Sequence, residues 1–199
     1  MLSFPYPESI SKEELKELPL MTFTGRIHII DNMKDAKSAA YHLSKHEVLG
    51  FDTEKKPTFQ KGAYHPTALV QLATDEEAYL FRITHNTIAQ PLLELLESEE
   101  IKKVGVGIRD DIQELQMVQN FRPGAFMELI DITKSLGIIN AGVRNLAGIF
   151  LQKRVSKNQQ TSNWENPQLT KAQQLYASAD AWIPQEIYKL LDQKGYLYP

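Results

Sequence analysis

The sequence predicts an α/β fold with a mixed β-sheet, an antiparallel meander followed by parallel βα units, flanked by helices. Three apolar segments at 49–54, 68–73 and 78–83 follow one another without an intervening helical pattern, which is typical of antiparallel strands. After residue 86, short apolar segments alternate with helical patterns, which indicates parallel strands joined by crossovers. With 199 residues, the chain is long enough for one sizeable domain with a full core.

The composition excludes several classes of protein. The formal net charge is −3, so a nucleic-acid partner would need a local basic patch. The chain has no cysteine, which excludes disulfides, thiolate zinc sites and a cysteine nucleophile. No apolar run approaches membrane-spanning length, and the first residues lack the basic start and apolar core of a signal peptide. A soluble, cytoplasmic protein without a membrane partner is therefore expected.

The chain is expected to divide into an N-terminal arm with a short helix, residues 1–25, and one larger domain, residues 26–195. Pro and Ser are frequent in the first ten residues, which carry no helical or strand pattern. Ser11 can cap a short charged helix, and Glu14, three residues later, would complete a capping box.

The elements of the larger domain follow from its apolar spacing. Short apolar segments bounded by turn residues predict strands, and apolar residues three and four positions apart predict helices. The predicted strands are 26–30, 49–54, 68–73, 78–83, 103–108 and 126–132, and the predicted helices are 33–45, 87–98, 110–118, 143–151 and 169–194. This order of elements matches the ribonuclease-H-like architecture, although a fold alone does not determine a function.

Two carboxylates end the strand 49–54, where Asp52 and Glu54 are separated by a single residue. Side chains alternate along a strand, so these two point the same way. Carboxylates this close repel each other unless a cation lies between them, and hard divalent cations prefer oxygen ligands. Asp75 and Glu77 have the same spacing but lie in a polar turn, where a solvated pair is expected.

A third acidic residue, Asp111, follows a strand with glycines and falls in the first turn of the next helix. An acid in this place is favoured by the helix dipole whatever its function. A dinucleotide-binding glycine loop is a competing interpretation, since Gly105 and Gly107 supply its first two glycines. The third position is Asp110, whose negative charge would oppose a pyrophosphate, so this interpretation is disfavoured.

The last helix carries a phenol and a carboxylate four residues apart, Tyr176 and Asp180, which places both on one helix face. Small residues at 177–179 would let the helix approach the sheet closely. Tyr188 and Asp192 repeat the spacing without the small residues. A core aromatic with its hydroxyl at the surface is the alternative interpretation of Tyr176.

The order of these residues resembles the three exonuclease motifs of the DEDD superfamily. Its tyrosine subgroup, with exonuclease domains of the Werner-helicase and ribonuclease D types, is the match, because position 175 is leucine where the histidine subgroup has histidine. The resemblance spans about residues 26–192. The matching segments are 50–54, 68–72, 104–111, 162–164 and 175–181.

The resemblance implies a metal-dependent 3′–5′ exonuclease that hydrolyses phosphodiester bonds from a free 3′ end of DNA or RNA and releases nucleoside 5′-monophosphates. It implies that two divalent ions, Mg²⁺ or Mn²⁺, are bound by four carboxylates, those of Asp52, Glu54, Asp111 and Asp180. Tyr176 would orient the attacking water. A catalytically inactive nucleic-acid-binding module on the same fold is the alternative.

Contacts to the nucleic acid are expected from the backbone N–H of Thr53 and from Lys157 and Trp164, in a loop that the resemblance places near the substrate. Cations and aromatic rings suit this task, because phosphates and bases need charge and stacking surfaces. Further candidate cations in the two polar loops are Lys55, Lys56, Lys61, Lys153 and Arg154. Lys55 and Lys56 stand where Werner-type domains have an aromatic residue, so substrate choice is not predicted.

Overall fold

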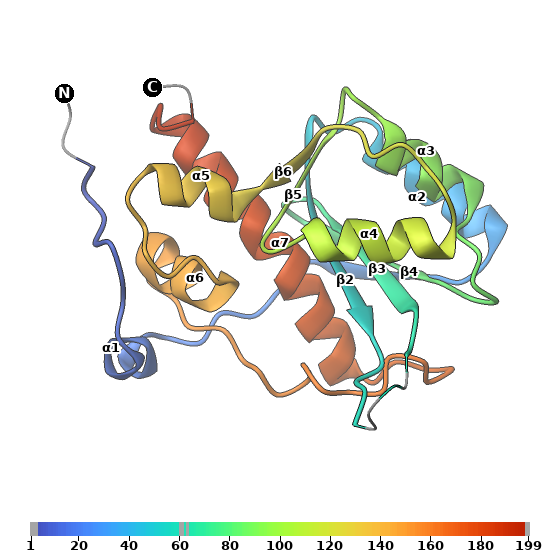
Figure 1. Cartoon of the computed structure of the whole chain (residues 1–199), viewed down its shortest axis with the longest axis horizontal. Coiled ribbons are helices and arrows are strands. Elements are labelled where there is room, and N and C mark those ends of the chain that lie inside the picture. Colours follow the sequence, from blue (N-terminus) through green and yellow to red (C-terminus); the bar gives the residue numbers. More distant parts are fainter. Residues whose placement is uncertain (1–3, 60–61, 63, 198–199) are drawn as a thin grey trace.

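The computed structural model describes residues 4–59, 62 and 64–197, so Lys61 lies outside the described residues. At its centre is a six-stranded sheet in the order β1-β4-β3-β2-β5-β6 (Figure 1). The strands are β1 (Arg26–Ile30), β2 (Val48–Lys55), β3 (Thr67–Ala73), β4 (Glu77–Arg82), β5 (Lys102–Gly105) and β6 (Phe126–Glu128). Antiparallel pairing joins β2, β3 and β4, whereas β2, β5 and β6 run parallel. The predicted meander followed by parallel units is therefore confirmed.

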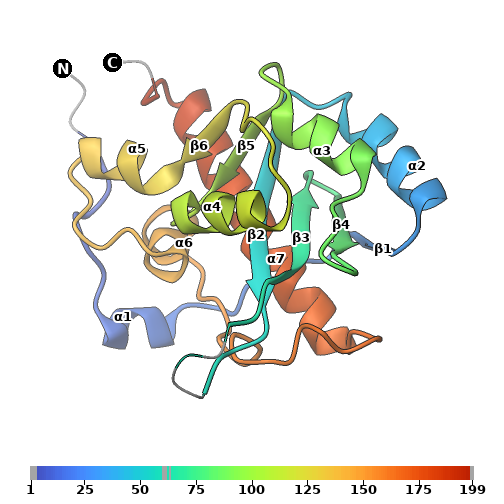
Figure 2. The same ribbon diagram turned by 45° about the vertical axis from the view of Figure 1, so that its right-hand side comes forward.

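Helices cover both faces of this sheet. They are α1 (Lys12–Glu17), α2 (Met33–Leu43), α3 (Gln90–Glu97), α4 (Arg109–Val118), α5 (Leu129–Ser135), α6 (Val143–Leu151) and α7 (Lys171–Gln193). One face packs on α2, α3 and α4, and the other on α5, α6 and α7, with α7 crossing the sheet against β2 (Figures 1 and 2). Within the described part of the chain, no helix combines the length and the apolar character needed to cross a membrane.

The N-terminal arm packs against the larger domain. The predicted capping box is present, with Ser11 and Glu14 each accepting a hydrogen bond from the backbone N–H of the other residue. The rings of Phe4 and Tyr6 lie 6.3 and 4.7 Å from the ring of Phe150 in α6. The arm therefore adds apolar surface to the α6 side of the core.

The segment 126–132 is predicted as one strand, and this prediction is wrong for its second half, which is helical. The strand β6 ends at Glu128, and α5 begins at the next residue. A short apolar run suits a buried strand and a buried helical turn equally, so periodicity could not separate them. The boundary depends on the Glu128 side chain, which accepts a hydrogen bond from the Ile130 N–H at 3.0 Å and caps α5.

Close packing of α7 on β2 depends on Gly50. A Cβ atom at this position would lie 1.9 Å from the carbonyl oxygen of Ala181, so a side chain cannot be accommodated without moving the helix. The small residues at 177–179 also lie against the sheet, where Ala177 and Ser178 are fully buried. Because Asp180 precedes Ala181, this contact brings its carboxylate to the strand that carries the first two acids.

Candidate active site

Three carboxylates form a compact group where the C-terminal half of β2 meets α7. The ligand oxygens of Asp52, Glu54 and Asp180 lie within 4.8 Å of one another. Asp52 and Glu54 alternate with Thr53 along the strand, so both project from the face on which α7 packs. The prediction that these two acids lie side by side is therefore confirmed, and Asp180 joins them from the helix.

Asp111 comes from α4, which packs on the opposite face of the sheet. Its carboxylate accepts a hydrogen bond from the hydroxyl of Thr53. Asp111 lies outside the compact group of three, but its charge raises the pKa values of Asp52 and Glu54. The Thr53 hydroxyl therefore holds a fourth acid beside the other three, a role that the sequence did not predict. The contact of the Thr53 backbone N–H with a nucleotide stays a prediction.

Burial raises the pKa of each of these four carboxylates and is the largest cause in every case. The pKa of Asp52 lies well above its usual range, because the charges of Asp180 and Asp111 add to the effect of burial. The pKa of Glu54 is raised to about 10, and that of Asp180 to about 7. Negative charge is therefore costly here, and a bound cation would offset this cost.

The metal-free protein is expected to lose stability as the pH rises. The folded-state pKa values of Glu54 and Asp180 exceed the ordinary values of 4.5 and 3.8, so the folded state holds more protons than the unfolded state between those values and about 10 and 7. In EDTA, the melting temperature should fall by several degrees as the pH rises from 5 to 8, because of these carboxylates. The double variant Glu54→Gln, Asp180→Asn should show a smaller decrease. An equal decrease in both proteins would show that other groups cause the pH dependence.

Tyr176 lies one helical turn before Asp180, and a hydrogen bond from its hydroxyl lowers the pKa of that carboxyl, opposing the effect of burial. Burial and the Asp180 charge raise the pKa of Tyr176, so the phenol is protonated at neutral pH. The ring of Trp164 lies 6.1 Å from that of Tyr176 and has no exposed surface. The indole thus offers no exposed surface to a nucleotide in this structure and packs against Tyr176, and a contact between Trp164 and a nucleotide stays a prediction.

The remaining predicted residues lie apart from the carboxylates. Lys157 is exposed and lines a groove beside α1 and α6. Asp75 forms an ion pair with Lys189, and Glu77 forms one with Arg26 at 2.8 Å. These two acids share the spacing of Asp52 and Glu54 but lie at the other end of the sheet from the carboxylate group, as their polar turn predicted.

Comparison with known proteins assigns the family. The family model described as 3′–5′ exonuclease matches residues 27–195. The chain belongs to the 3′–5′ exonuclease family. The bifunctional 3′–5′ exonuclease/ATP-dependent helicase WRN of Mus musculus is 33% identical over 199 residues, which cover 94% of this chain and 14% of that protein. A 3′–5′ exonuclease of Arabidopsis thaliana is 27% identical over 92% of this chain and 69% of its own length.

Solved structures share the fold of this exonuclease-family domain. The EXO domain of Aedes aegypti Nibbler matches with a TM-score of 0.77 and 22% identity, covering 87% of this chain and 92% of that one. Escherichia coli RNase D, an exoribonuclease, matches with a TM-score of 0.74 and 20% identity, covering 86% and 47%. The ribonuclease-H-like fold is thereby confirmed, and the family model together with the mouse relative confirms the DEDD-superfamily resemblance. The chain spans 14% of the mouse protein and 45% of a putative 3′–5′ exonuclease of a mimivirus.

The acidic group fits the divalent cations on which this exonuclease family depends. Three carboxylates within 4.8 Å of one another offer only oxygen ligands, which hard divalent cations prefer. Their raised pKa values show that the folded chain holds them together without enough positive charge to compensate. Carboxylates that repel one another in this way gain stability from a metal ion.

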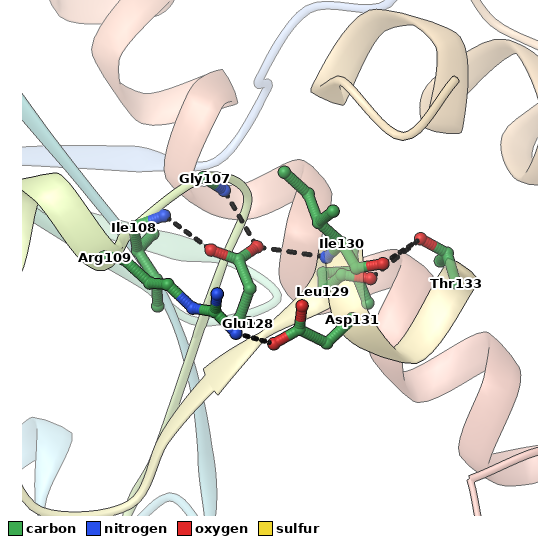
Figure 3. A network of polar contacts seen from close by, with 8 residues as sticks. All are labelled: Gly107, Ile108, Arg109, Glu128, Leu129, Ile130, Asp131 and Thr133. Carbon is green, nitrogen blue, oxygen red and sulfur yellow. Dashed lines mark hydrogen bonds and ion pairs between the residues drawn. The ribbon is translucent and has the colours of Figure 1, made fainter. Parts of the chain in front are cut away.

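Glu128, which the sequence did not single out, fixes the start of α4. Its Oε1 accepts hydrogen bonds from the N–H groups of Gly107 at 2.8 Å and Ile130 at 3.0 Å, and its Oε2 accepts one from the Ile108 N–H at 2.8 Å (Figure 3). Gly107 has a φ of 78°, which favours glycine, and α4 has no capping side chain of its own. Glu128 therefore caps, from another strand, the helix that carries Asp111.

A second contact joins α4 to α5 in the same network. The guanidinium of Arg109, the first residue of α4, forms an ion pair with Asp131 at 2.5 Å (Figure 3). Both side chains are more than half exposed, so this ion pair contributes little to stability. The three hydrogen bonds to the Glu128 carboxylate are thus the stronger part of the connection, since bonds to an ionised acceptor are worth about twice neutral ones.

Proposed function

We propose that the chain is an active 3′–5′ exonuclease that removes nucleotides from a free 3′ end of DNA or RNA as nucleoside 5′-monophosphates. The observation that carries this proposal is the group of carboxylates between β2 and α7, in a chain of the 3′–5′ exonuclease family. A Trypanosoma brucei RNase D with the same fold, at a TM-score of 0.74, is solved in complex with RNA U12. That complex supports nucleic acid as the substrate.

Two divalent ions, Mg²⁺ or Mn²⁺, are assigned to Asp52, Glu54, Asp111 and Asp180. Bound together, such ions lower the pKa of an attacking water and stabilise the leaving 3′ oxygen. Asp52 is the proposed shared ligand: it lies within 4.8 Å of Glu54 and Asp180, and the Asp111 charge acts on its pKa as it does on that of Glu54. Thr53 supports this arrangement by holding the Asp111 carboxylate with its hydroxyl.

Tyr176 is proposed to position the attacking water. Its raised pKa keeps the phenol protonated, so it acts through hydrogen bonds and is unsuited to the role of general base. Asp180 accepts one hydrogen bond from this hydroxyl, whose oxygen can still accept one from water. Trp164 packs against the phenol ring and fixes its orientation.

Tyr176→Phe is expected to lower kcat about 10- to 100-fold, because a positioned hydrogen-bonding group contributes about that much. The metal concentration for half-maximal activity should change less than threefold, since all four carboxylates remain. Both values follow from initial rates on one oligonucleotide across a Mn²⁺ titration. Unchanged kcat would remove Tyr176 from the mechanism. The control is Tyr188→Phe, at the second Tyr–Asp spacing of the same helix.

The proposed activity is tested with a 5′-labelled 20-nucleotide strand of DNA or RNA and the purified chain. Stepwise shortening is expected with Mg²⁺ or Mn²⁺, together with nucleoside 5′-monophosphates detected by chromatography, and EDTA should stop both. Nucleoside 3′-monophosphates, or cleavage that persists in EDTA, would contradict the proposal. Binding without cleavage of either nucleic acid under both metals would instead indicate a catalytically inactive binding module.

A further inference from the structure

A groove of about 560 Å³ lies between α1, the start of α6 and the segment that leads from α6 to α7. Half of its ten lining residues are cationic, and none is a carboxylate. The cations are Lys12, Lys16, Arg144, Arg154 and Lys157. In a chain with a formal net charge of −3, this is a strong local concentration of positive charge.

These five cations form no ion pair with an Asp or Glu of the described residues. The cations directly after the acidic strand differ, because Lys55 is paired with Glu114 and Lys56 with Glu165 at 3.2 Å. Although α1 also carries Glu13, Glu14 and Glu17, none of these carboxylates lines the groove or pairs with its cations, so the cations are available to an external anion. The groove is therefore better suited to phosphate than the lysines that lie nearer in sequence to the carboxylates.

Hydrogen bonds to the backbone hold the two arginines of the groove in place. The Nε of Arg154 donates to the carbonyl oxygen of Leu18 at 2.9 Å, and the Nε of Arg144 donates to that of Val155 at 3.4 Å. Their terminal guanidinium nitrogens remain as donors for a ligand. Arg154 also donates its backbone N–H to Pro19, so the arm and the segment after α6 form one fixed wall. A preorganised cation loses less entropy when it binds phosphate.

The segment after α6 connects this groove to the carboxylates. It carries Lys157 at the groove and, seven residues later, Trp164, which packs against Tyr176 of the acidic site. Seven residues span at most about 25 Å. A stacked strand advances about 3.4 Å per nucleotide, so roughly seven nucleotides or fewer cover this distance. In both views the segment runs from beneath α6 to the start of α7 (Figures 1 and 2).

We propose that this cationic groove binds the phosphate backbone of the substrate strand several nucleotides away from the 3′ end that lies among the carboxylates. The inference rests on the proposed exonuclease function for the strand's direction, but the groove's affinity for nucleic acid does not depend on catalysis. It assigns the short N-terminal helix α1 a part in substrate binding, through Lys12 and Lys16.

The test variant carries Lys12→Gln, Lys16→Gln and Lys157→Gln, because these three lysines are exposed and none of their side chains forms a hydrogen bond or ion pair within the described residues. The matched control carries Lys34→Gln, Lys37→Gln and Lys45→Gln, three exposed lysines on and after α2. Binding of a labelled 20-nucleotide strand is measured in EDTA by fluorescence anisotropy across a salt series. Hydrolysis of the 20-nucleotide strand and of a dinucleotide is measured with Mn²⁺.

The groove variant should bind the 20-nucleotide strand at least about tenfold more weakly, and its slope of log affinity against log salt should become shallower by about 2, as for three lost phosphate contacts. Its kcat/KM should fall at least tenfold on the 20-nucleotide strand and less than twofold on the dinucleotide. The control should match wild type in each measurement. Equal binding and equal salt slopes in the two triple variants would overturn the proposal, as would equal losses on both substrates. If the wild type cleaved neither substrate but the groove variant still bound the 20-nucleotide strand more weakly, the proposed role of the groove would be supported. Only the proposed activity would then be contradicted.

Discussion

Asp52→Asn is expected to lower the exonuclease rate by roughly a thousandfold or more. The Asp52 carboxylate lies within 4.8 Å of Glu54 and Asp180, and the charges of Asp111 and Asp180 both act on its pKa, so its loss would affect the whole acidic group. Asparagine keeps the size of the side chain, but it has one carbonyl oxygen and no negative charge, so it cannot serve as a shared ligand. The rate is measured on a 5′-labelled strand at saturating Mn²⁺.

The same substitution should stabilise the metal-free protein. Asp52 is half-buried beside other carboxylates that raise its pKa, so removing its charge relieves repulsion. At pH 8 in EDTA, a gain of about 1 kcal/mol would raise the melting temperature by 2–4 °C. A variant that is less active and more stable separates the loss of a metal ligand from damage to the fold.

Asp75→Asn is the matched control for this experiment. It makes the same chemical change within the second Asp-x-Glu spacing of the chain, where Asp75 is exposed and paired with Lys189. Its activity should stay within about twofold of wild type, because breaking an exposed ion pair costs at most about 1 kcal/mol of stability. If Asp52→Asn kept a tenth of the wild-type rate at saturating metal, Asp52 would not be the shared ligand.

Much of the sheet could be predicted because its strands have patterns that no other local structure explains. The meander has three apolar segments separated by polar turns, and its pairing follows from their order. The helical second half of the segment 126–132, predicted as part of a strand, could not be recognised, since its apolar residues satisfy a strand and a helix equally. What ends the strand is the Glu128 carboxylate, and two of its three donors lie about twenty residues earlier in the chain. Local patterns do not contain such partners.

The acidic site likewise has features that the sequence predicts and others that it does not. Asp52 and Glu54 could be predicted to lie together because a strand fixes their relative direction, and the small residues near Asp180 indicated the close approach of α7. The contacts that Thr53 and Trp164 make to other site residues could not be predicted, since each joins segments far apart in the sequence. The sequence predicts nucleotide contacts for the Thr53 backbone N–H and for Trp164. In the structure, the Thr53 hydroxyl holds Asp111 and the indole packs against Tyr176.

Glu128→Gln is expected to lower kcat about 30- to 100-fold and to raise the metal concentration for half-maximal activity about tenfold. The carboxylate now accepts three backbone N–H groups, including those of Gly107 and Ile108 at the start of α4. Glutamine places an NH₂ group, which cannot accept, against at least one of them, so a donor is left unpaired or the helix start moves. Asp111 lies in the first turn of that helix, and its carboxylate moves with it.

Arg109→Gln separates this positioning role from general stability. It removes the exposed ion pair between Arg109 and Asp131, which joins the same two helices, but leaves the acceptors of Glu128 in place. Its kcat and metal dependence should stay within about threefold of wild type. If Glu128 had only a structural role, Glu128→Gln would lower the melting temperature but leave kcat and the metal dependence unchanged at 20 °C. A shifted metal titration in Glu128→Gln alone is the result that only a displaced Asp111 explains, because neither substitution removes a metal ligand.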